Sequence, residues 1–508
     1  MAYTSEYFGP SAGNYANDDL VQLIDNFTKE DVNFIKITKW IDGTVINSSN
    51  ESNFIDGTIY MKKDTNVYYV REIIFGGERM NIKWFGAEGN GTSDDTLSIQ
   101  TAFNLLFKLR NAESITSIFF PNGNYLVTDM LKFPCGCELI GDNKRSTRIF
   151  TNDNHYDLIY VYENADFSTN NNDTVYWTTI KNINLAGKNR NLSISDEFFY
   201  SPDCHIKTNN ANSGIVFNKL SRTYLENIII EGFETSGLLY NECYYHRFNH
   251  IMIRKNKIGL LTYKCTSIHG LNSEFRFNSV GHSLQENTYS CSFVNCMLES
   301  NYGKYMSDDI DYNSTPDYHN GVAVYMNNSF KNVYSNCYFE RHICTFYLIN
   351  SYNNIINNSF ICAGSTYNYT NLDGNSGFLN NSKDNIFEKN LYYTGNENKA
   401  KYYLSSTSIN NYFEFTDLES FNDFIIKLDN INNFTDKTHA PKAILSSHNK
   451  MFINGIVLPI NIGISTGTTI QRPSANSINV GFQFFDTTLN KPIWWDGSYW
   501  RDFSGLII

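Results

Sequence analysis

The middle of the chain repeats a short pattern in which an Asn stands beside a run of mostly apolar residues. Each run alternates enough to bury one row of side chains, as a short strand does. The repeats are Asn227-Ile228-Ile229-Ile230, Asn249-His250-Ile251-Met252, Asn272-Ser273-Glu274-Phe275, Asn295-Cys296-Met297-Leu298, Asn336-Cys337-Tyr338-Phe339 and Asn357-Asn358-Ser359-Phe360. They begin 22, 23, 23, 41 and 21 residues apart. A period near 22 predicts stacked coils, and the step of 41 represents two coils or one coil with an insertion.

One such coil cannot bury its inward row alone, whereas stacked strands about 4.8 Å apart bury it together. We expect the repeated Asn residues to point inward at one turn and form a ladder of side-chain amides, because buried donors need acceptors. The strand pattern continues through Asn385-Ile386-Phe387 to about Phe424.

A different pattern occupies residues 84–110, where a Gly-rich loop precedes an amphipathic helix. The apolar positions Ile99, Ala102, Phe103 and Leu106 fall on one helical face. We expect Thr92 or Ser93 to cap this helix and the two following Asp residues to lie in its first turn. This structural role is favoured over metal binding or catalysis. No Walker Lys-Ser/Thr pair follows the glycines, which argues against a nucleotide site.

The two ends of the chain have their own patterns. Residues 1–75 contain short strand patterns such as Phe54-Ile55-Asp56-Gly57-Thr58-Ile59-Tyr60 and indicate a small head. Residues 430–438 are polar and indicate a linker. The tail that follows holds three of the six Trp residues. Its Trp495, Tyr499 and Trp500 either form a small hairpin core or subunit contact, which is favoured, or stack on sugars.

Composition narrows the class of protein. The chain has 508 residues, a net charge of -12, 15% aromatic and only 18% charged residues. An acidic chain without a basic run argues against nucleic-acid binding. We recognise no signal peptide and no apolar run long enough to insert into a membrane. The ten Cys residues show no paired CxxC motif, so we expect buried small apolar side chains rather than zinc ligands.

Two segments resemble known families. Residues 86–102 read GAEGNGTSDDTLSIQTA and residues 120–125 read FPNGNY. They resemble the start of the pectate-lyase-like superfamily, whose pattern is roughly G-A-x-G-D-G-x-T-D-D-T-x-A-I-Q-x-A and then F-P-x-G-x-Y, with departures at Asn90, Ser93 and Ser98. Residues 485–500 read FDTTLNKPIWWDGSYW, which resembles a segment common at the ends of bacteriophage tail fibre and tailspike proteins.

These resemblances imply an all-β fold, a right-handed single-stranded parallel β-helix that assembles into a homotrimer. They imply a virion-attachment head at residues 1–75, a β-helix at residues 76–425 with a capping helix near residues 94–110, and a linker with a β-rich tip at residues 426–508. Tailspikes are parts of the virion tail, made in the host cytoplasm. The implied partners are a host surface polysaccharide and, through the head, other phage tail or baseplate proteins.

Cleavage of a glycosidic bond needs two carboxyl groups, about 5 Å apart for retention or about 6.5–9.5 Å apart for inversion. Glu299 and Glu340 each stand fourth after a repeat Asn, as Glu231 does, and they are our catalytic candidates. Glu274 lies two residues earlier in its own coil and is a substrate-binding candidate. Arg341 and His342 are candidates to hold a charged sugar. The competing and favoured interpretation is structural, with the Glu residues solvated or paired with Arg254 or Arg276.

The insertion at residues 302–320 adds acids among aromatic residues, which suits a carbohydrate groove and equally suits a solvated loop. Its substrate-binding candidates are Asp308, Asp309, Asp311 and Tyr305. The segment lacks the Asp-x-Asp-x-Asp-Gly order of a calcium loop, and we expect neither a metal nor a cofactor. We expect hydrolysis rather than β-elimination, with a non-catalytic receptor-binding fibre and a polysaccharide lyase as the alternatives.

Overall fold

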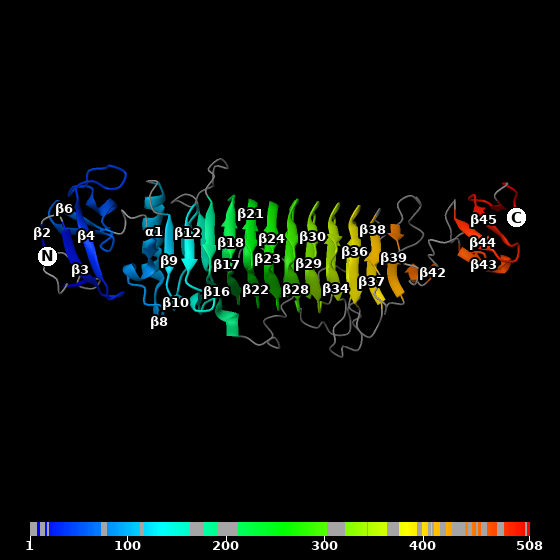
Figure 1. Ribbon diagram of the computed structural model, residues 1–508, viewed down its shortest axis with the longest axis horizontal. Helices are drawn as coiled ribbons and strands as arrows, with labels where there is room; N and C mark the ends of the chain where they lie inside the picture. Colours follow the sequence, from blue (N-terminus) through cyan, green and yellow to red (C-terminus); the bar gives the residue numbers. More distant parts are fainter. Residues whose placement is uncertain are drawn as a thin grey trace. The chain divides into compact units, whose positions relative to one another are not determined.

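The computed structural model describes residues 8–10, 16–17, 20–72, 79–111, 116–162, 177–191, 212–301, 321–342, 344–362, 375–393, 399–404, 408, 411–416, 423–428, 442–444, 450–453, 456–458, 465–474, 482–502 and 505–508. Contacts divide the chain into two compact units, Met1–Gly321 and Val322–Ile508, and each is described by itself. In both units nearly all regular structure is β-strand (Figure 1).

The first unit begins with a six-stranded sheet that runs mainly in the order β1-β3-β4-β6-β5, with β2 beside β3. Its strands are β1 (Phe8–Pro10), β2 (Ala16–Asn17), β3 (Leu20–Asp25), β4 (Asp31–Ile37), β5 (Tyr60–Asp64) and β6 (Val67–Arg71), with the 3-10 helix η1 (Glu51–Asn53) before β5. Val21, Val32 and Phe34 form part of its buried cluster. The sheet lies within the residues for which the sequence indicated a head.

Parallel strands on three faces, A, B and C, build the coils that follow (Figure 1). Face A holds β11 (Leu131–Pro134), β14 (Ile159–Tyr162), β17 (Ser213–Asn218), β20 (Ser236–Asn241), β23 (Ile258–Tyr263) and β26 (Val280–Gln285). Face B holds β7 (Met80–Asn81), β9 (Ser117–Phe120), β12 (Glu138–Gly141), β15 (Thr178–Lys181), β18 (Thr223–Glu226), β21 (Tyr244–Asn249), β24 (Thr266–Leu271) and β27 (Ser292–Val294). Face C holds β8 (Asn90–Asp94), β10 (Gly123–Val127), β13 (Thr147–Thr151), β16 (Asn184–Ala186), β19 (Ile229–Glu231), β22 (Met252–Arg254), β25 (Glu274–Arg276) and β28 (Met297–Glu299).

The strand pairing confirms the repeat read from the sequence. Arg254 lies opposite Arg276 on the next strand of face C, and Arg276 lies opposite Glu299. These steps of 22 and 23 residues make one coil each. The fold is a right-handed parallel β-helix, as the sequence implied.

The Asn ladder proved to involve other residues than those expected. Asn227, Asn272 and Asn295 have φ near +50° and form the corner between faces B and C, where Asn tolerates the left-handed backbone. Amide contacts do link Asn272 to its neighbours, but they are exposed rather than inward. The buried ladder runs through Asn256, Asn278 and Asn301, with amide contacts of 3.2 and 3.1 Å.

Helix α1 (Thr96–Asn111) follows β8 and the 3-10 helix η3 (Ile82–Phe85). The four apolar positions expected on its inner face are fully buried. Its N-terminal end differs from the expectation, because residues 90–94 form β8 and so neither Thr92 nor Ser93 caps the helix. Asp94 accepts from the backbone of Thr96, and Asp95 accepts from the backbone of Glu88 and Gly89. Both acids are thus bound within the opening loop.

The second unit continues with parallel strands and ends in a small sheet. Its parallel strands include β29 (Val322–Asn327), β30 (Val333–Ser335), β31 (Tyr338–Glu340), β32 (Cys344–Ile349), β33 (Ile355–Asn357), β34 (Phe360–Cys362), β35 (Asn375–Asn380), β36 (Ile386–Tyr393), β37 (Lys399–Leu404), β38 (Tyr412–Thr416), β39 (Asp423–Leu428), β40 (Lys442–Ile444) and β41 (Lys450–Ile453), and β42 (Ile456–Leu458) returns antiparallel to β41. The final sheet contains β43 (Ser465–Gly467), β44 (Gln483–Asp486), β45 (Lys491–Trp495) and β46 (Trp500–Asp502), with the 3-10 helix η9 (Thr469–Gln471).

The tail forms a small buried core, and the described cysteines are buried. Trp495 and Trp500 pack with Phe484 and Ile493 in a buried cluster, which bears out the hairpin-core interpretation. The expected linker at residues 430–438 lies outside the described residues. All nine described Cys side chains are buried thiols, as expected from their spacing.

Candidate functional site

Face C of the first unit presents two outward columns of side chains. The middle residue of each three-residue strand points inward and is fully buried: Leu185, Ile230, Ile253, Phe275 and Leu298. The first residues form one outward column: Asn184, Ile229, Met252, Glu274 and Met297. The third residues form the other: Ala186, Glu231, Arg254, Arg276 and Glu299. Period-two alternation on short strands thus brings charged groups from successive coils into register.

Two ion pairs occupy the second column. The Nε atom of Arg254 donates to a Glu231 carboxylate oxygen at 2.8 Å. The Nε atom of Arg276 lies 3.1 Å from a Glu299 carboxylate oxygen on the next strand. This is the pairing of stacked Glu residues with Arg254 and Arg276 that the favoured, structural interpretation of the sequence expected.

The second pair also involves Glu274. A terminal guanidinium nitrogen of Arg276 lies 3.6 Å from a Glu274 carboxylate oxygen. The Glu274 side chain is 38% exposed and that of Glu299 is 15% exposed. Because both contact one guanidinium, their nearest carboxylate oxygens can be at most roughly 9 Å apart, a limit compatible with the spacing of a glycosidase pair. The carboxyl group of Glu299 is therefore less accessible to water than that of Glu274.

The other catalytic candidate, Glu340, lies on β31 in the second unit. Neither unit by itself contains both Glu299 and Glu340, so their pairing stays a prediction. A Glu340 oxygen accepts from the Tyr338 hydroxyl at 2.6 Å, and the other lies 3.4 Å from Nε of Arg341. Glu340 is opposite Cys362 on β34. Burial, with the nearby Glu340 charge adding to it, raises the pKa of the Cys362 thiol to about 11.

An aromatic pair lies beside Glu340. The rings of Tyr338 and Phe360 stack with centroids 5.2 Å apart and planes 8° apart. These two residues are opposite each other on β31 and β34, and both are half-buried. Stacked aromatic rings on neighbouring strands provide an apolar surface on which a sugar ring can pack. Neither ring was among the sequence candidates, although Tyr338 stands two residues after Asn336 and Phe360 two residues after Asn358.

The remaining sequence candidates differ in accessibility. The Arg341 side chain is 37% exposed, whereas His342 is 2% exposed and does not present its ring at the surface. Asp308, Asp309, Asp311 and Tyr305 lie outside the described residues.

Within the described part of the chain, no group of three or more His, Cys, Asp or Glu side chains has the arrangement of a metal site. In the same part, no helix has the length and apolar character needed to span a membrane.

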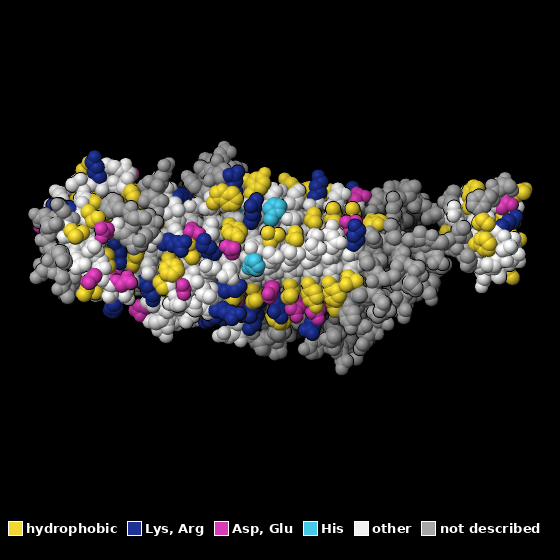
Figure 2. All heavy atoms as spheres, viewed as in Figure 1, with side chains coloured by type: hydrophobic (Ala, Val, Ile, Leu, Met, Phe, Trp, Pro, Cys, Tyr) yellow, Lys and Arg dark blue, Asp and Glu magenta, His cyan; other side chains and the backbone are white. Residues whose placement is uncertain are grey.

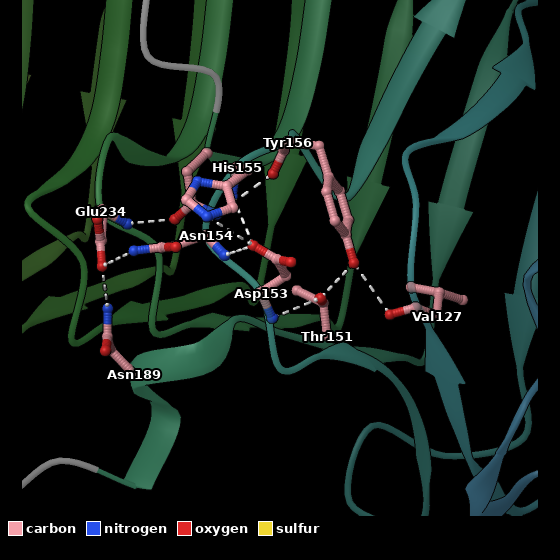
Figure 3. A network of polar contacts seen from close by, with 9 residues as sticks. Val127, Thr151, Asp153, Asn154, His155, Tyr156, Asn189 and Glu234 are labelled. Carbon is pink, nitrogen blue, oxygen red and sulfur yellow. Dashed lines mark hydrogen bonds and ion pairs between the residues drawn. The ribbon is translucent and has the colours of Figure 1, made fainter.

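A polar network braces the edge of face C near β13 and β16 (Figure 3). One carboxylate oxygen of Glu234 accepts from the side-chain amides of Asn154 at 2.7 Å and Asn189 at 3.2 Å. The Tyr156 hydroxyl contacts Thr151 and donates to the Val127 carbonyl at 3.0 Å. The network therefore ties the β13–β14 turn to the 3-10 helix η4 (Lys188–Asn191) that follows β16.

Comparisons with known proteins agree with this fold. The enzymatically active domain of tailspike protein 2 from bacteriophage CBA120 has a similar structure, with a TM-score of 0.55 and 12% identity over 89% of this chain and 62% of that chain. The tailspike protein gp49 of Acinetobacter baumannii bacteriophage Fri1, a capsular polysaccharide depolymerase, gives a TM-score of 0.50 and 12% identity over 88% of this chain and 74% of that chain. At such low identity, these likenesses show the fold alone.

A search of curated protein sequences found no match. A family model does match residues 79–345, more than half of the 508 residues. The matched segment runs from just before the opening loop through the coils that carry Glu231, Glu274, Glu299 and Glu340. The chain therefore belongs to the rhamnogalacturonase A/epimerase, pectate lyase-like family.

Proposed function

We propose that this chain is a phage tailspike that binds a surface polysaccharide of the host cell and cleaves it by glycosidic hydrolysis on face C. The observation that carries this proposal is the shared contact of Glu274 and Glu299 with Arg276. The names of the two similar structures, both tailspikes and one a capsular polysaccharide depolymerase, support the biological setting.

The chemistry follows from the two carboxyl groups. One, protonated, gives its proton to the glycosidic oxygen as the bond to the anomeric carbon breaks. The other, ionised, takes a proton from the water that attacks that carbon, or attacks it directly. We propose Glu299 as one member. Its partner is Glu274, which shares the guanidinium, or Glu340, which holds the matching place in its own coil.

Sugar binding is proposed for the groups beside these acids. The ring pair Tyr338–Phe360 offers the apolar faces on which pyranose rings stack, and Arg341 offers donors at the surface. The residues Asp308, Asp309, Asp311 and Tyr305 remain proposed contacts, as does His342, whose buried ring would act through its neighbours.

The decisive experiment incubates the purified full-length protein with a panel of capsular polysaccharides and measures polymer size and new reducing ends. Glu299→Gln, Glu274→Gln and Glu340→Gln are compared with Glu242→Gln, which makes the same change at an exposed corner between faces A and B. If Glu299→Gln and one of the other two variants lose cleavage, the two substituted residues are the catalytic pair. Glu242→Gln should match wild type.

Other results would replace the proposal. An unsaturated product that absorbs ultraviolet light would make the protein a lyase. Binding of a polysaccharide without cleavage would make it a receptor-binding fibre. Cleavage that survives all three substitutions would move the catalytic residues elsewhere.

We further propose that the protein is a homotrimer in the virion tail and that residues 1–75 attach it to other tail or baseplate proteins. The separate six-stranded sheet near the N-terminus supports a distinct attachment module. Light scattering of the full chain gives its mass, and a value other than three chains would reject the trimer. Phage particles assembled with a chain lacking residues 1–75 should contain none of it.

A further inference from the structure

A serine and a histidine meet on face B of the first unit, on a different face from the acids described above. His269 on β24 and Ser292 on β27 lie opposite each other on neighbouring strands. The Nδ1 atom of His269 is 2.7 Å from the Ser292 hydroxyl oxygen. Both side chains are half-buried and therefore reach the surface. In Figure 2, His side chains are visible at the surface in the region of β21 and β24.

The packing beneath the two strands holds this pair in place. The next residue along each strand, Gly270 or Phe293, is buried and faces inward. A Cβ atom at Gly270 would lie 2.4 Å from the Phe248 ring, so glycine is what allows that ring to pack directly under the strand. Side chains carried by well-packed strands keep a fixed orientation, as a catalytic pair requires.

The contact has the polarity of a nucleophile and its base. Burial lowers the pKa of His269, and the charge of Arg247 on the neighbouring strand lowers it further. The imidazole is therefore neutral at pH 7, and with its proton on Nε2 it accepts at Nδ1 from the Ser292 hydroxyl. A serine hydroxyl bound to a neutral imidazole is the arrangement that activates serine for attack on a carbonyl carbon.

Two apolar side chains lie next to this pair. Leu271 and Val294 follow His269 and Ser292 by two residues each, so they leave the same outward face of the sheet. They are opposite each other in the strand pairing, and Leu271 is 42% exposed. This small apolar surface suits an uncharged group of a few carbon atoms beside the serine oxygen. The surroundings therefore fit an ester whose acyl group is short.

We propose that His269 and Ser292 form a second active site, which hydrolyses esters of short-chain carboxylic acids. Leu271 and Val294 contact the acyl group. This activity goes beyond the proposed glycosidic hydrolysis and does not depend on it, because it uses other residues, another face and a different bond.

The reaction has two stages. The Ser292 oxygen attacks the ester carbonyl carbon while Nδ1 of His269 takes the hydroxyl proton. The bond between that carbon and the alcohol oxygen then breaks, and His269 gives its proton to the departing alcohol. Water attacks the acyl-serine that remains, with His269 taking a proton from the water, and the carboxylic acid leaves as the proton returns to Ser292. One ester and one water thus become one acid and one alcohol.

The first test measures hydrolysis of para-nitrophenyl acetate by the purified full-length protein. Ser292→Ala removes the nucleophile, and His269→Asn removes the base. The matched controls are Ser335→Ala, at a half-buried position on β30, and His250→Asn, at an exposed corner. We expect Ser292→Ala and His269→Asn to lose about 100-fold or more in kcat/KM, whereas both controls should match wild type.

A covalent label distinguishes catalysis from a structural hydrogen bond. Phenylmethanesulfonyl fluoride should sulfonylate the Ser292 oxygen with loss of fluoride, and peptide mass spectrometry should locate the label there. His269→Asn should slow this labelling about tenfold or more, because the serine then lacks its base.

The inference fails if wild type hydrolyses the ester no faster than Ser292→Ala, or if either control loses as much activity as the matching variant. It also fails if the label does not reach Ser292, or reaches it equally fast in His269→Asn. Melting curves identify a variant that does not fold, and in that case the other variant and the labelling of wild type decide.

Discussion

Arg276 on β25 and Glu299 on β28 form an ion pair between neighbouring coils, with 3.1 Å between Nε and a carboxylate oxygen. The same guanidinium contacts Glu274 on its own strand at 3.6 Å. One cation thereby contacts two carboxylates that two different coils supply. This geometry makes the face C acids a candidate for catalysis as well as for structure.

Arg276→Gln should therefore reduce polysaccharide cleavage much more than it reduces stability. A partly exposed ion pair contributes about 1 kcal/mol or less to folding, so the melting temperature should change little. Misplaced catalytic groups commonly cost about 10²-fold in rate, and we expect a loss of that order in kcat/KM. Arg247→Gln serves as the control, and equal cleavage by Arg276→Gln and wild type would contradict a positioning role.

The buried imidazole of His282 should make the protein sensitive to acid. Its ring lies between Phe275 and Phe293, with centroids 4.1 and 4.6 Å away, and burial lowers its pKa to about 3. The folded pKa is below the unfolded value of about 6.5, so the stability linked to this group is complete above about pH 6.5 and falls as the pH drops toward 3.

His282→Leu should remove that dependence, because Leu260 occupies the opposite position in the same inward column. Between pH 7.5 and 4.5 wild type should lose up to about 3 kcal/mol more than the variant. Thermal unfolding at both pH values measures the difference, with the exposed His250→Asn as control. Parallel losses in His282→Leu and wild type would show that other groups dominate.

The buried amide ladder should contribute far more stability than the exposed one. Asn278 accepts from both the backbone and the side chain of Asn256 and donates to the Ile253 carbonyl and to Asn301. Asn278→Ala leaves several of these groups buried without partners, at about 1–3 kcal/mol each.

Its matched control is Asn272→Gly, which removes an exposed ladder amide and keeps the positive φ. Unfolding experiments should show a loss of several kcal/mol for Asn278→Ala and about 1 kcal/mol or less for Asn272→Gly. Similar losses in both variants would mean that burial does not determine how much these amides contribute to the free energy of unfolding.

In the C-terminal sheet, substitution of a buried aromatic residue should cost more stability than substitution of an exposed one. Trp500 is 8% exposed and packs on Phe484 and Trp495, whereas Tyr499 is 53% exposed. Trp500→Ala should cost about 3–5 kcal/mol in that sheet and abolish its near-ultraviolet circular dichroism signal, whereas Tyr499→Ala should preserve it. Polysaccharide affinity measured alongside decides the sugar-stacking alternative, which requires Tyr499→Ala to weaken binding.

The spacing of the repeats along the sequence was enough to indicate the fold. A period of 22–23 residues is a property of the coil length, and the strand register reproduces it. Spacing also aligned Glu231, Glu299 and Glu340 as equivalent positions, and Glu231 and Glu299 proved to lie in one column. The expected buried ladder contained Asn272, whereas the observed one contains Asn278. Both positions carry Asn in successive coils, and only the conformation of the backbone at the turn decides which of them points inward.

What the tertiary structure alone decided is which charges meet. Arg190 follows β16 and Lys255 follows β22, 65 residues later, yet the Lys255 ammonium contacts the Arg190 carbonyl. No local pattern marks such a contact, because it depends on how many coils separate the two residues and on the direction of each side chain. Short-range periodicity therefore determined the β-helix, whereas the stacking of coils determined the charged surfaces that it displays.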